Sequence, residues 1–143
     1  MGAGAAGVCV LVWFAVLSWY DVRQRRLPNW LTVPGATAIL AGAAAVGHGG
    51  PAVAGAASLF AVYLVLHLMT PTAMGAGDVK LAAGIGALTG SFGIDVWLLA
   101  ALGAPLLTAG WAIVVRVGSA ERTVPHGPSM CVTAAAATAL VVL

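Results

Sequence analysis

Apolar residues follow one another in long stretches along this chain, and short polar or turn-forming segments separate the stretches. A helix needs about 20 apolar residues to cross the hydrocarbon core of a bilayer. Six stretches are predicted to be helices of this kind: residues 3–20, 30–46, 52–69, about 78–89, 94–117 and about 129–143. The pattern therefore predicts an all-α membrane protein, a bundle of about six transmembrane helices forming a single domain over residues 1–143.

The fourth stretch, residues 78–89, is short and rich in glycine. A helix of this length has to be shielded from lipid by its neighbours. Its Gly86-x-x-x-Gly90 spacing allows close contact between helices, because small residues one turn apart leave room for another backbone. We therefore expect this helix to depend on its neighbours.

The composition supports a membrane protein. Apolar residues make up 62% of the chain, charged residues only 7%, and the mean hydropathy is +1.05. A soluble domain has about 25% charged residues, so this chain cannot cover a soluble surface with polar groups. A soluble enzyme, a nucleic-acid-binding module and a disordered tail are thereby excluded, and the net charge of +2 is too small to indicate a nucleic-acid partner. The partner that the composition indicates is the lipid bilayer, and the oligomeric state is not predicted.

Charge sets the orientation. With six crossings, the segments around residues 21–29, 70–80 and 116–127 fall on one side of the membrane, and that side carries every cation: Arg23, Arg25, Arg26, Lys80, Arg116 and Arg122. The positive-inside rule makes this side cytoplasmic. The three arginines near the first helix are also expected to attract anionic lipid headgroups.

Two of the four acids fall at the cytoplasmic edge. Asp21 ends the first stretch and Asp78 begins the fourth, and the two crossings between them return the chain to the same side. Parity therefore places both carboxylates at a similar depth, where an acid indicates a functional site. Simpler explanations remain: Asp21 as a partner of nearby arginines, and Asp78 as a helix cap beside Lys80. For the other two acids, Asp95 and Glu121, solvation in a loop is explanation enough.

Glycines precede Asp78 at positions 75 and 77. Glycine lets another chain approach the backbone closely, so an extended substrate strand can come within reach of this carboxylate. If Asp21 and Asp78 meet, they cannot both ionise easily, and one of them keeps a proton. One carboxylate then activates water while the other protonates a peptide carbonyl, as in aspartic proteases. This chemistry needs no metal ion or other cofactor.

These residues form motifs. Gly75-Ala76-Gly77-Asp78 matches the GxGD signature of intramembrane aspartic proteases. The chain resembles the type IV prepilin peptidases because three motifs occur in the right order: Asp21-x-Arg23 with Leu27-Pro28-Asn29, then GxGD with Lys80-Leu81, then Val124-Pro125-His126-Gly127-Pro128. The resemblance implies a bundle of about six transmembrane helices with an active site near the cytoplasmic membrane surface.

The same resemblance implies roles for single residues. It makes Asp21 and Asp78 the catalytic pair, and the residues expected to bind substrate or support the pair are Gly75, Gly77, Lys80, Pro125, Gly127 and Pro128. The family removes the short basic leader of prepilins or pilin-like subunits, usually just after a glycine. Larger members also N-methylate the new terminus and carry a cytoplasmic region with paired cysteines, which this sequence lacks. We therefore predict the compact form, similar to the peptidases of Flp/Tad-type pilus systems or of archaeal preflagellin processing.

Some roles stay open. Lys80 is expected either to bias which acid is charged or to bind a lipid phosphate. His67 is expected to be a hydrogen-bonded structural histidine or to tune the acid pair. His126 stands where the family commonly has an aromatic apolar residue, and the sequence gives no reason for the change. Cys9 and Cys131 are expected to be small buried hydrophobes that do not pair.

Two other functions fit a chain of this composition. A small proton-coupled carrier would use Asp21 and Asp78 as a proton relay, and a membrane scaffold would need no chemistry at all. Carriers usually place their acids near the bilayer midplane, whereas these two acids fall at the edge. A scaffold does not need a GxGD motif beside a second acid. The sequence therefore favours an aspartic endopeptidase of the cell membrane that cleaves prepilin-like proteins.

Overall fold

The computed structural model describes residues 2–24, 27–70, 76–118 and 126–142. These residues form six helices and no strand: α1 (Gly2–Gln24), α2 (Asn29–Ala45), α3 (Gly49–Met69), α4 (Ala76–Phe92), α5 (Ile94–Gly118) and α6 (Gly127–Val142). Three of them, α1, α3 and α5, are long and apolar enough to cross a membrane by length and composition. The predicted all-helical membrane bundle is confirmed.

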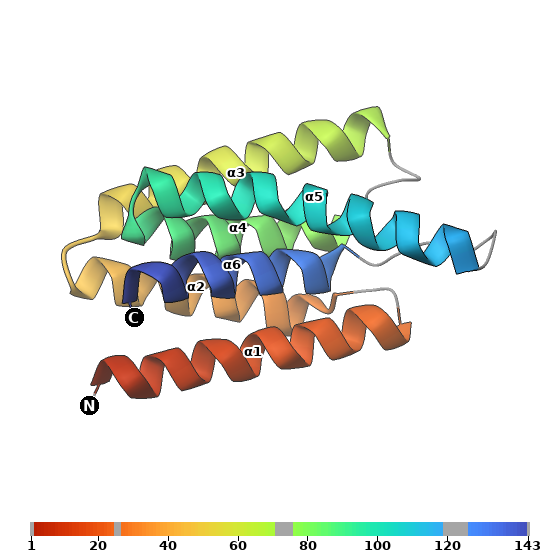
Figure 1. The fold of residues 1–143 in the computed structure, drawn as a ribbon. Helices are drawn as coiled ribbons and strands as arrows, with labels where there is room; N and C mark the ends of the chain where they lie inside the picture. The colour runs from red at the N-terminus through yellow and green to blue at the C-terminus, as the bar shows by residue number, and fades with distance from the viewer. Residues whose placement is uncertain (1, 25–26, 71–75, 119–125, 143) are drawn as a thin grey trace.

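The helices lie side by side and alternate in direction (Figure 1). The turns that join α2 to α3 and α4 to α5 lie at one end of the bundle. The start of α1 and the end of α6 lie at the same end. Each turn contains a glycine in the left-handed region, Gly47 with φ +83° and Gly93 with φ +122°. Other residues rarely adopt this conformation, so these two glycines allow the chain to reverse within a few residues.

Helix α4 lies inside the bundle and packs against α2, α3, α5 and α6. Its buried residues are Val79, Leu81, Ala82, Gly84, Ile85, Gly86, Ala87, Thr89 and Gly90. Close approach to α3 depends on glycine: a Cβ atom on Gly86 would collide with the carbonyl oxygen of Gly55, and one on Gly90 would lie 2.7 Å from the carbonyl oxygen of Pro51. The expectation that neighbours shield this short helix is confirmed.

Helix α1 lies at the edge of the bundle and packs against α6 and α2 (Figure 1). Trp13 anchors it, because the indole Nε1–H donates to the carbonyl oxygen of Leu31 at 2.8 Å. A Cβ atom on Gly35 would collide with this indole, and one on Gly84 would lie 2.9 Å from it. Large apolar side chains on the outer surface, among them Leu106, Val114 and Leu140, are exposed, as expected of a surface that faces lipid.

Three helix ends differ from the sequence-based expectation, and two of them carry the acids. Helix α1 continues to Gln24, so Asp21 lies inside its last turn. Helix α4 begins at Ala76, so Asp78 is the third helical residue and does not cap the helix. Helix α3 begins at Gly49 and includes Pro51, because a proline in the first turn loses no intrahelical hydrogen bond.

Candidate active site

Asp21 is buried, with 7% of its surface exposed. Its carboxylate oxygen Oδ2 accepts a hydrogen bond of 2.8 Å from the backbone N–H of Gly127, the first residue of α6. The N–H groups in the first turn of a helix have no partner within that helix and carry a partial positive charge. The N-terminus of α6 therefore provides the Asp21 carboxylate with a hydrogen-bond donor and a positive electrostatic potential.

Gly127 is the residue that makes this contact sterically possible. A Cβ atom at this position would lie 2.5 Å from Asp21 Oδ2 and 3.1 Å from its Cγ atom. The carboxylate thus occupies the space where any other residue would place its side chain. Pro128 follows within the first turn of α6, where the fixed φ of proline suits the helix and its missing N–H costs nothing. Both residues, predicted to support the acid pair, lie where they shape the start of α6.

Asp78 lies in the first turn of α4 and is half-buried. Its carboxyl group is close enough to Asp21 for their charges to interact, and the phenol of Tyr63 on α3 interacts with the same carboxyl group. The structure therefore brings Asp21 and Asp78, which are far apart in sequence, to the same end of the bundle. Tyr63 was not singled out in the sequence. A tyrosine inside an otherwise apolar helix was the signal that could have identified it.

Gly77, near the start of α4, lies close to Leu27, which precedes α2. A Cβ atom on Gly77 would lie 3.0 Å from Leu27 Cβ and 3.3 Å from the backbone nitrogen of Leu27. The glycine therefore lets the segment after α1 pack closely on the start of α4. Two further predicted support residues, Gly75 and Pro125, lie outside the described residues.

The geometry described so far agrees with a comparison against known families. The model of the type IV leader peptidase family matches residues 8–143. This chain belongs to the type IV leader peptidase family. It is accordingly a peptidase with several membrane-crossing helices. No curated protein and no solved structure matched the chain in the comparisons.

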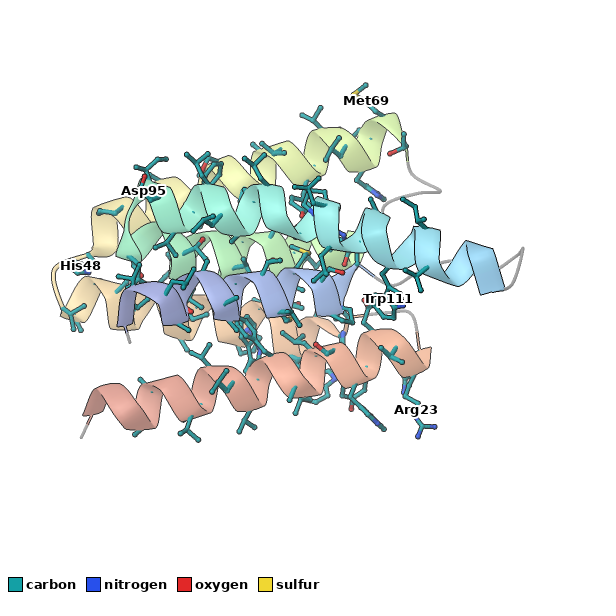
Figure 2. The ribbon with its side chains drawn as sticks, in the orientation of Figure 1. Arg23, His48, Met69, Asp95 and Trp111 are labelled. Atoms are coloured by element: carbon teal, nitrogen blue, oxygen red, sulfur yellow. The ribbon has the colours of Figure 1, made fainter. Side chains whose placement is uncertain are left out.

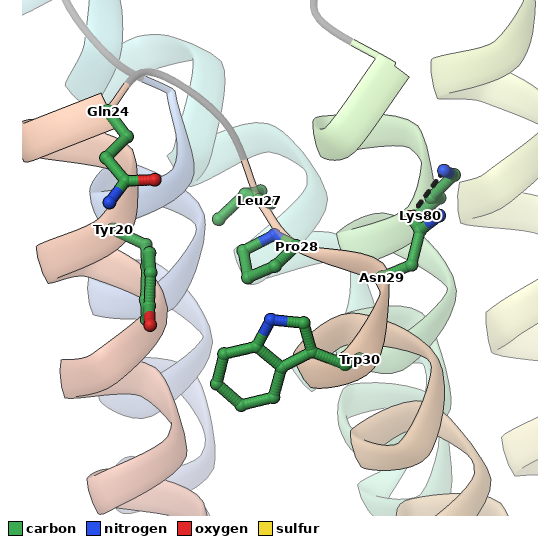
Figure 3. A pocket seen from close by; sticks show the side chains of 7 residues that line it. All are labelled: Tyr20, Gln24, Leu27, Pro28, Asn29, Trp30 and Lys80. Carbon is green, nitrogen blue, oxygen red and sulfur yellow. Dashed lines mark hydrogen bonds between the residues drawn. The ribbon is translucent and has the colours of Figure 1, made fainter.

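In this leader peptidase, Lys80 points toward α2. Its Nζ donates a hydrogen bond to the side-chain oxygen Oδ1 of Asn29 (Figure 3). Both residues line a pocket of about 600 Å³ whose other walls are Tyr20, Gln24, Leu27, Pro28 and Trp30. Of the two roles considered for Lys80, binding an anionic group in this pocket fits its position better than setting the charge of the acids. Among the described residues, no carboxylate lines the pocket, and its aromatic walls are typical of a membrane interface.

His126 precedes Gly127 and is hydrogen-bonded at both ring nitrogens. Nε2 lies 2.7 Å from Tyr63 Oη on α3, and Nδ1 lies 2.7 Å from Thr108 Oγ1 on α5. The imidazole is half-buried, and desolvation lowers its pKa to about 4, so the ring is neutral at pH 7. The structure thus supplies the physical reason that the sequence lacked: this histidine pairs the hydroxyl groups of the buried Tyr63 and the half-buried Thr108, which an apolar residue would leave without this partner. Thr108 was also missed in the sequence.

Three further residues were considered as candidates in the sequence. Cys131 is buried and hydrogen-bonds with Ser18, one turn before Asp21, as expected of a structural thiol. Cys9 is exposed on α1, so the prediction that it is buried was wrong: the outer face of an edge helix is apolar without being covered by protein. His67 is half-buried near the end of α3, and its role stays a prediction. Among the described residues, no group of three or more His, Cys, Asp or Glu side chains is placed to hold a metal ion.

Proposed function

We propose that this leader peptidase is an aspartic endopeptidase in which Asp21 and Asp78 form the catalytic pair, within one domain that spans residues 1–143. The observation that carries the proposal is the position of the buried Asp21 carboxylate. It accepts the N–H of Gly127 and interacts with the charge of Asp78. Residues from α1, α4 and α6 therefore converge on one place at one end of the bundle. Aspartic protease chemistry requires two neighbouring carboxyl groups that share a proton.

The hydrogen bond from Gly127 suggests how the two acids divide the work. An N–H at a helix N-terminus favours negative charge on its acceptor, so Asp21 is assigned the ionised role and Asp78 keeps the shared proton. Asp21 removes a proton from the attacking water, whose oxygen bonds to the peptide carbon, while Asp78 protonates the carbonyl oxygen. The tetrahedral diol then returns that hydroxyl proton to Asp78. The C–N bond breaks as Asp21 gives its proton to the leaving amine.

The proposed substrates are type IV prepilins or pilin-like precursors of the Flp/Tad type, cut after a short basic leader. This finer assignment rests on the resemblance of the motifs around Asp21 and Asp78 and on membership of the leader peptidase family.

We also propose that the acids face the cytoplasm and that the protein resides in the cytoplasmic membrane. Arg23 and Met69 lie at one end of the bundle, and His48 and Asp95 lie at the other (Figure 2). The acid pair lies at the end that carries Arg23 and Lys80, and six crossings would put the other cations of the sequence on the same side of the membrane. By the positive-inside rule this end is cytoplasmic. A proton-coupled carrier is less well supported, because both acids lie near helix ends, whereas carriers bind near the midplane.

Cleavage by the purified protein tests the proposal. The full chain in detergent is incubated with a prepilin that carries a short basic leader, and leader removal is followed by mass spectrometry. Asp21→Asn and Asp78→Asn should each abolish cleavage. Asp95→Asn, which changes an exposed acid at the opposite end of the bundle, should leave the rate unchanged. Normal cleavage by either site variant would refute the pair. Proton uptake into vesicles with no cleavage would support the carrier instead.

A further inference from the structure

His126 connects three helices at the end of the bundle that holds the acids. Its ring accepts or donates hydrogen bonds to Tyr63 on α3 and Thr108 on α5, and both distances are 2.7 Å. Its backbone carbonyl accepts the N–H of Met130 at 3.0 Å and so begins the hydrogen-bond ladder of α6. The imidazole and the phenol are also in ring contact, with centroids 5.5 Å apart. The first turn of α6 is therefore fixed to its neighbours through one side chain.

His126 is connected to each acid through one intervening residue. On the backbone side, the next residue is Gly127, whose N–H donates to Asp21. On the side-chain side, the ring holds Tyr63, whose phenol interacts electrostatically with Asp78. A displacement of His126 would thus move the Gly127 N–H that donates to Asp21 and the Tyr63 phenol that interacts with Asp78.

We propose that His126 is a positioning residue of the catalytic pair: the Thr108–His126–Tyr63 chain holds the Gly127 N–H against Asp21 and aims the Tyr63 hydroxyl toward Asp78. The inference rests on the proposed aspartic mechanism and adds to it three residues outside the GxGD motif. In this proposal His126 acts on the acids through Gly127 and Tyr63.

The chemistry of imidazole suits this task. A neutral ring has one N–H donor and one acceptor nitrogen, and a hydroxyl group can play either part. In the tautomer protonated at Nδ1, the ring donates to Thr108 and accepts the Tyr63 O–H. In the tautomer protonated at Nε2, the ring donates to Tyr63 Oη, and the phenol proton is free to point to Asp78. Both tautomers satisfy every ring atom, so the network can follow a change in the protonation of Asp78 without breaking.

Three substitutions at His126 distinguish the effect of its hydrogen bonds on kcat from the effect of its side-chain volume. Phe keeps a ring but loses both bonds, Gln keeps a donor and acceptor near the position of Nε2, and Asn keeps them near Nδ1. Because a misplacement of about 1 Å costs about 10²-fold in rate, His126→Phe should lower kcat about 100-fold with KM nearly unchanged. Gln should restore most of kcat, since it can reach Tyr63, whereas Asn should restore little. Ser58→Ala, which removes an exposed hydroxyl of α3 bonded only within its own helix, should leave kcat unchanged.

A combined variant distinguishes positioning from simple stabilisation. His126→Phe alone removes the partner of one buried hydroxyl group, on Tyr63, and of one half-buried hydroxyl group, on Thr108, which destabilises the fold. The triple change His126→Phe, Thr108→Val and Tyr63→Phe removes all three polar groups together, so its melting temperature in detergent should return toward that of the unchanged protein. Its kcat should stay about 100-fold low, because the Tyr63 hydroxyl that interacts with Asp78 is gone and His126 is no longer fixed by hydrogen bonds.

The outcomes are decisive in either direction. Recovery of both melting temperature and kcat in the triple variant would overturn the positioning role and leave His126 as a structural residue. Equal kcat for His126→Phe and the unchanged protein would do the same. Asp21→Asn and Asp78→Asn are measured in the same assay: if they cleave, the proposed mechanism fails, whereas if they are inactive and the His126 variants are fully active, only the present inference fails.

Discussion

The contact between Asp21 and Gly127 can be broken by adding a single methyl group. In Gly127→Ala the new Cβ atom would lie 2.5 Å from Asp21 Oδ2, 3.1 Å from Cγ and 3.3 Å from Cβ of the same residue. A carbon atom cannot stay that close to a carboxylate oxygen, so either the Asp21 side chain rotates away or the start of α6 moves. Both responses break the 2.8 Å hydrogen bond from the Gly127 N–H.

The size of the effect follows from the groups involved. A hydrogen bond to a charged group contributes about 1.5–3 kcal/mol, and overpacking a tight contact costs about 1–3 kcal/mol. Because the same movement relieves the clash and breaks the bond, these costs overlap, and we expect the free energy of unfolding to fall by about 2–4 kcal/mol. Displacing the carboxylate of Asp21, the proposed catalytic base, by about 1 Å should also lower the cleavage rate about 100-fold.

Two measurements test this prediction, and a second glycine provides the control. Unfolding in detergent gives the stability, and leader removal from a prepilin gives the rate. Gly110→Ala in α5 adds the same methyl group where no atom lies within 4 Å, so it should gain about 0.5–1 kcal/mol of stability and keep full activity. If Gly127→Ala unfolds and cleaves like the unchanged protein, Asp21 is not held by the start of α6, and the assignment of its charged role fails with it.

Two further predictions concern packing and orientation. Gly86→Ala places a methyl group against the Gly55 carbonyl oxygen, so α3 and α4 must separate, and we expect a loss of about 1–3 kcal/mol of stability relative to Gly110→Ala. For orientation, a membrane-impermeant thiol reagent added to intact cells should label His48→Cys but not Thr70→Cys in a chain carrying Cys9→Ala. Both residues are exposed, and they flank α3 at its two opposite ends. The reverse pattern would place the acids on the outer face.

The sequence was sufficient to predict the number of helices, their approximate bounds and the end of the bundle at which Asp21 and Asp78 lie. Each of these depends on local composition and on parity. An apolar stretch must cross the membrane, and each crossing changes the side on which the next polar residue lies. The register of Asp21 was less accurate, because the last turn of α1 continues through polar residues that hydropathy alone would assign to a loop.

The contacts that define the site could not be derived in this way, because they join residues distant in the chain. Gly127 was selected by resemblance, and only the structure gives the reason, which is the carboxylate occupying the place of its side chain. His126 could not be explained without Tyr63 and Thr108, each on a different helix. The exposure of Cys9 also depended on tertiary structure, since it follows from the position of α1 at the edge of the bundle.

The glycine contact between α3 and α4 explains why Tyr63 and Asp78 lie toward the same end of the bundle. The two helices are antiparallel and touch where Gly55 faces Gly86. Tyr63 lies eight residues after Gly55, and Asp78 lies eight residues before Gly86. At 1.5 Å per residue, both lie about 12 Å from the contact toward the same end of the bundle. The small residues in the middle of the bundle therefore set the register that brings Tyr63 and Asp78 to the same end of the bundle, where their side chains interact. A short, glycine-rich helix, which is a poor membrane span by itself, is well suited to carry Asp78.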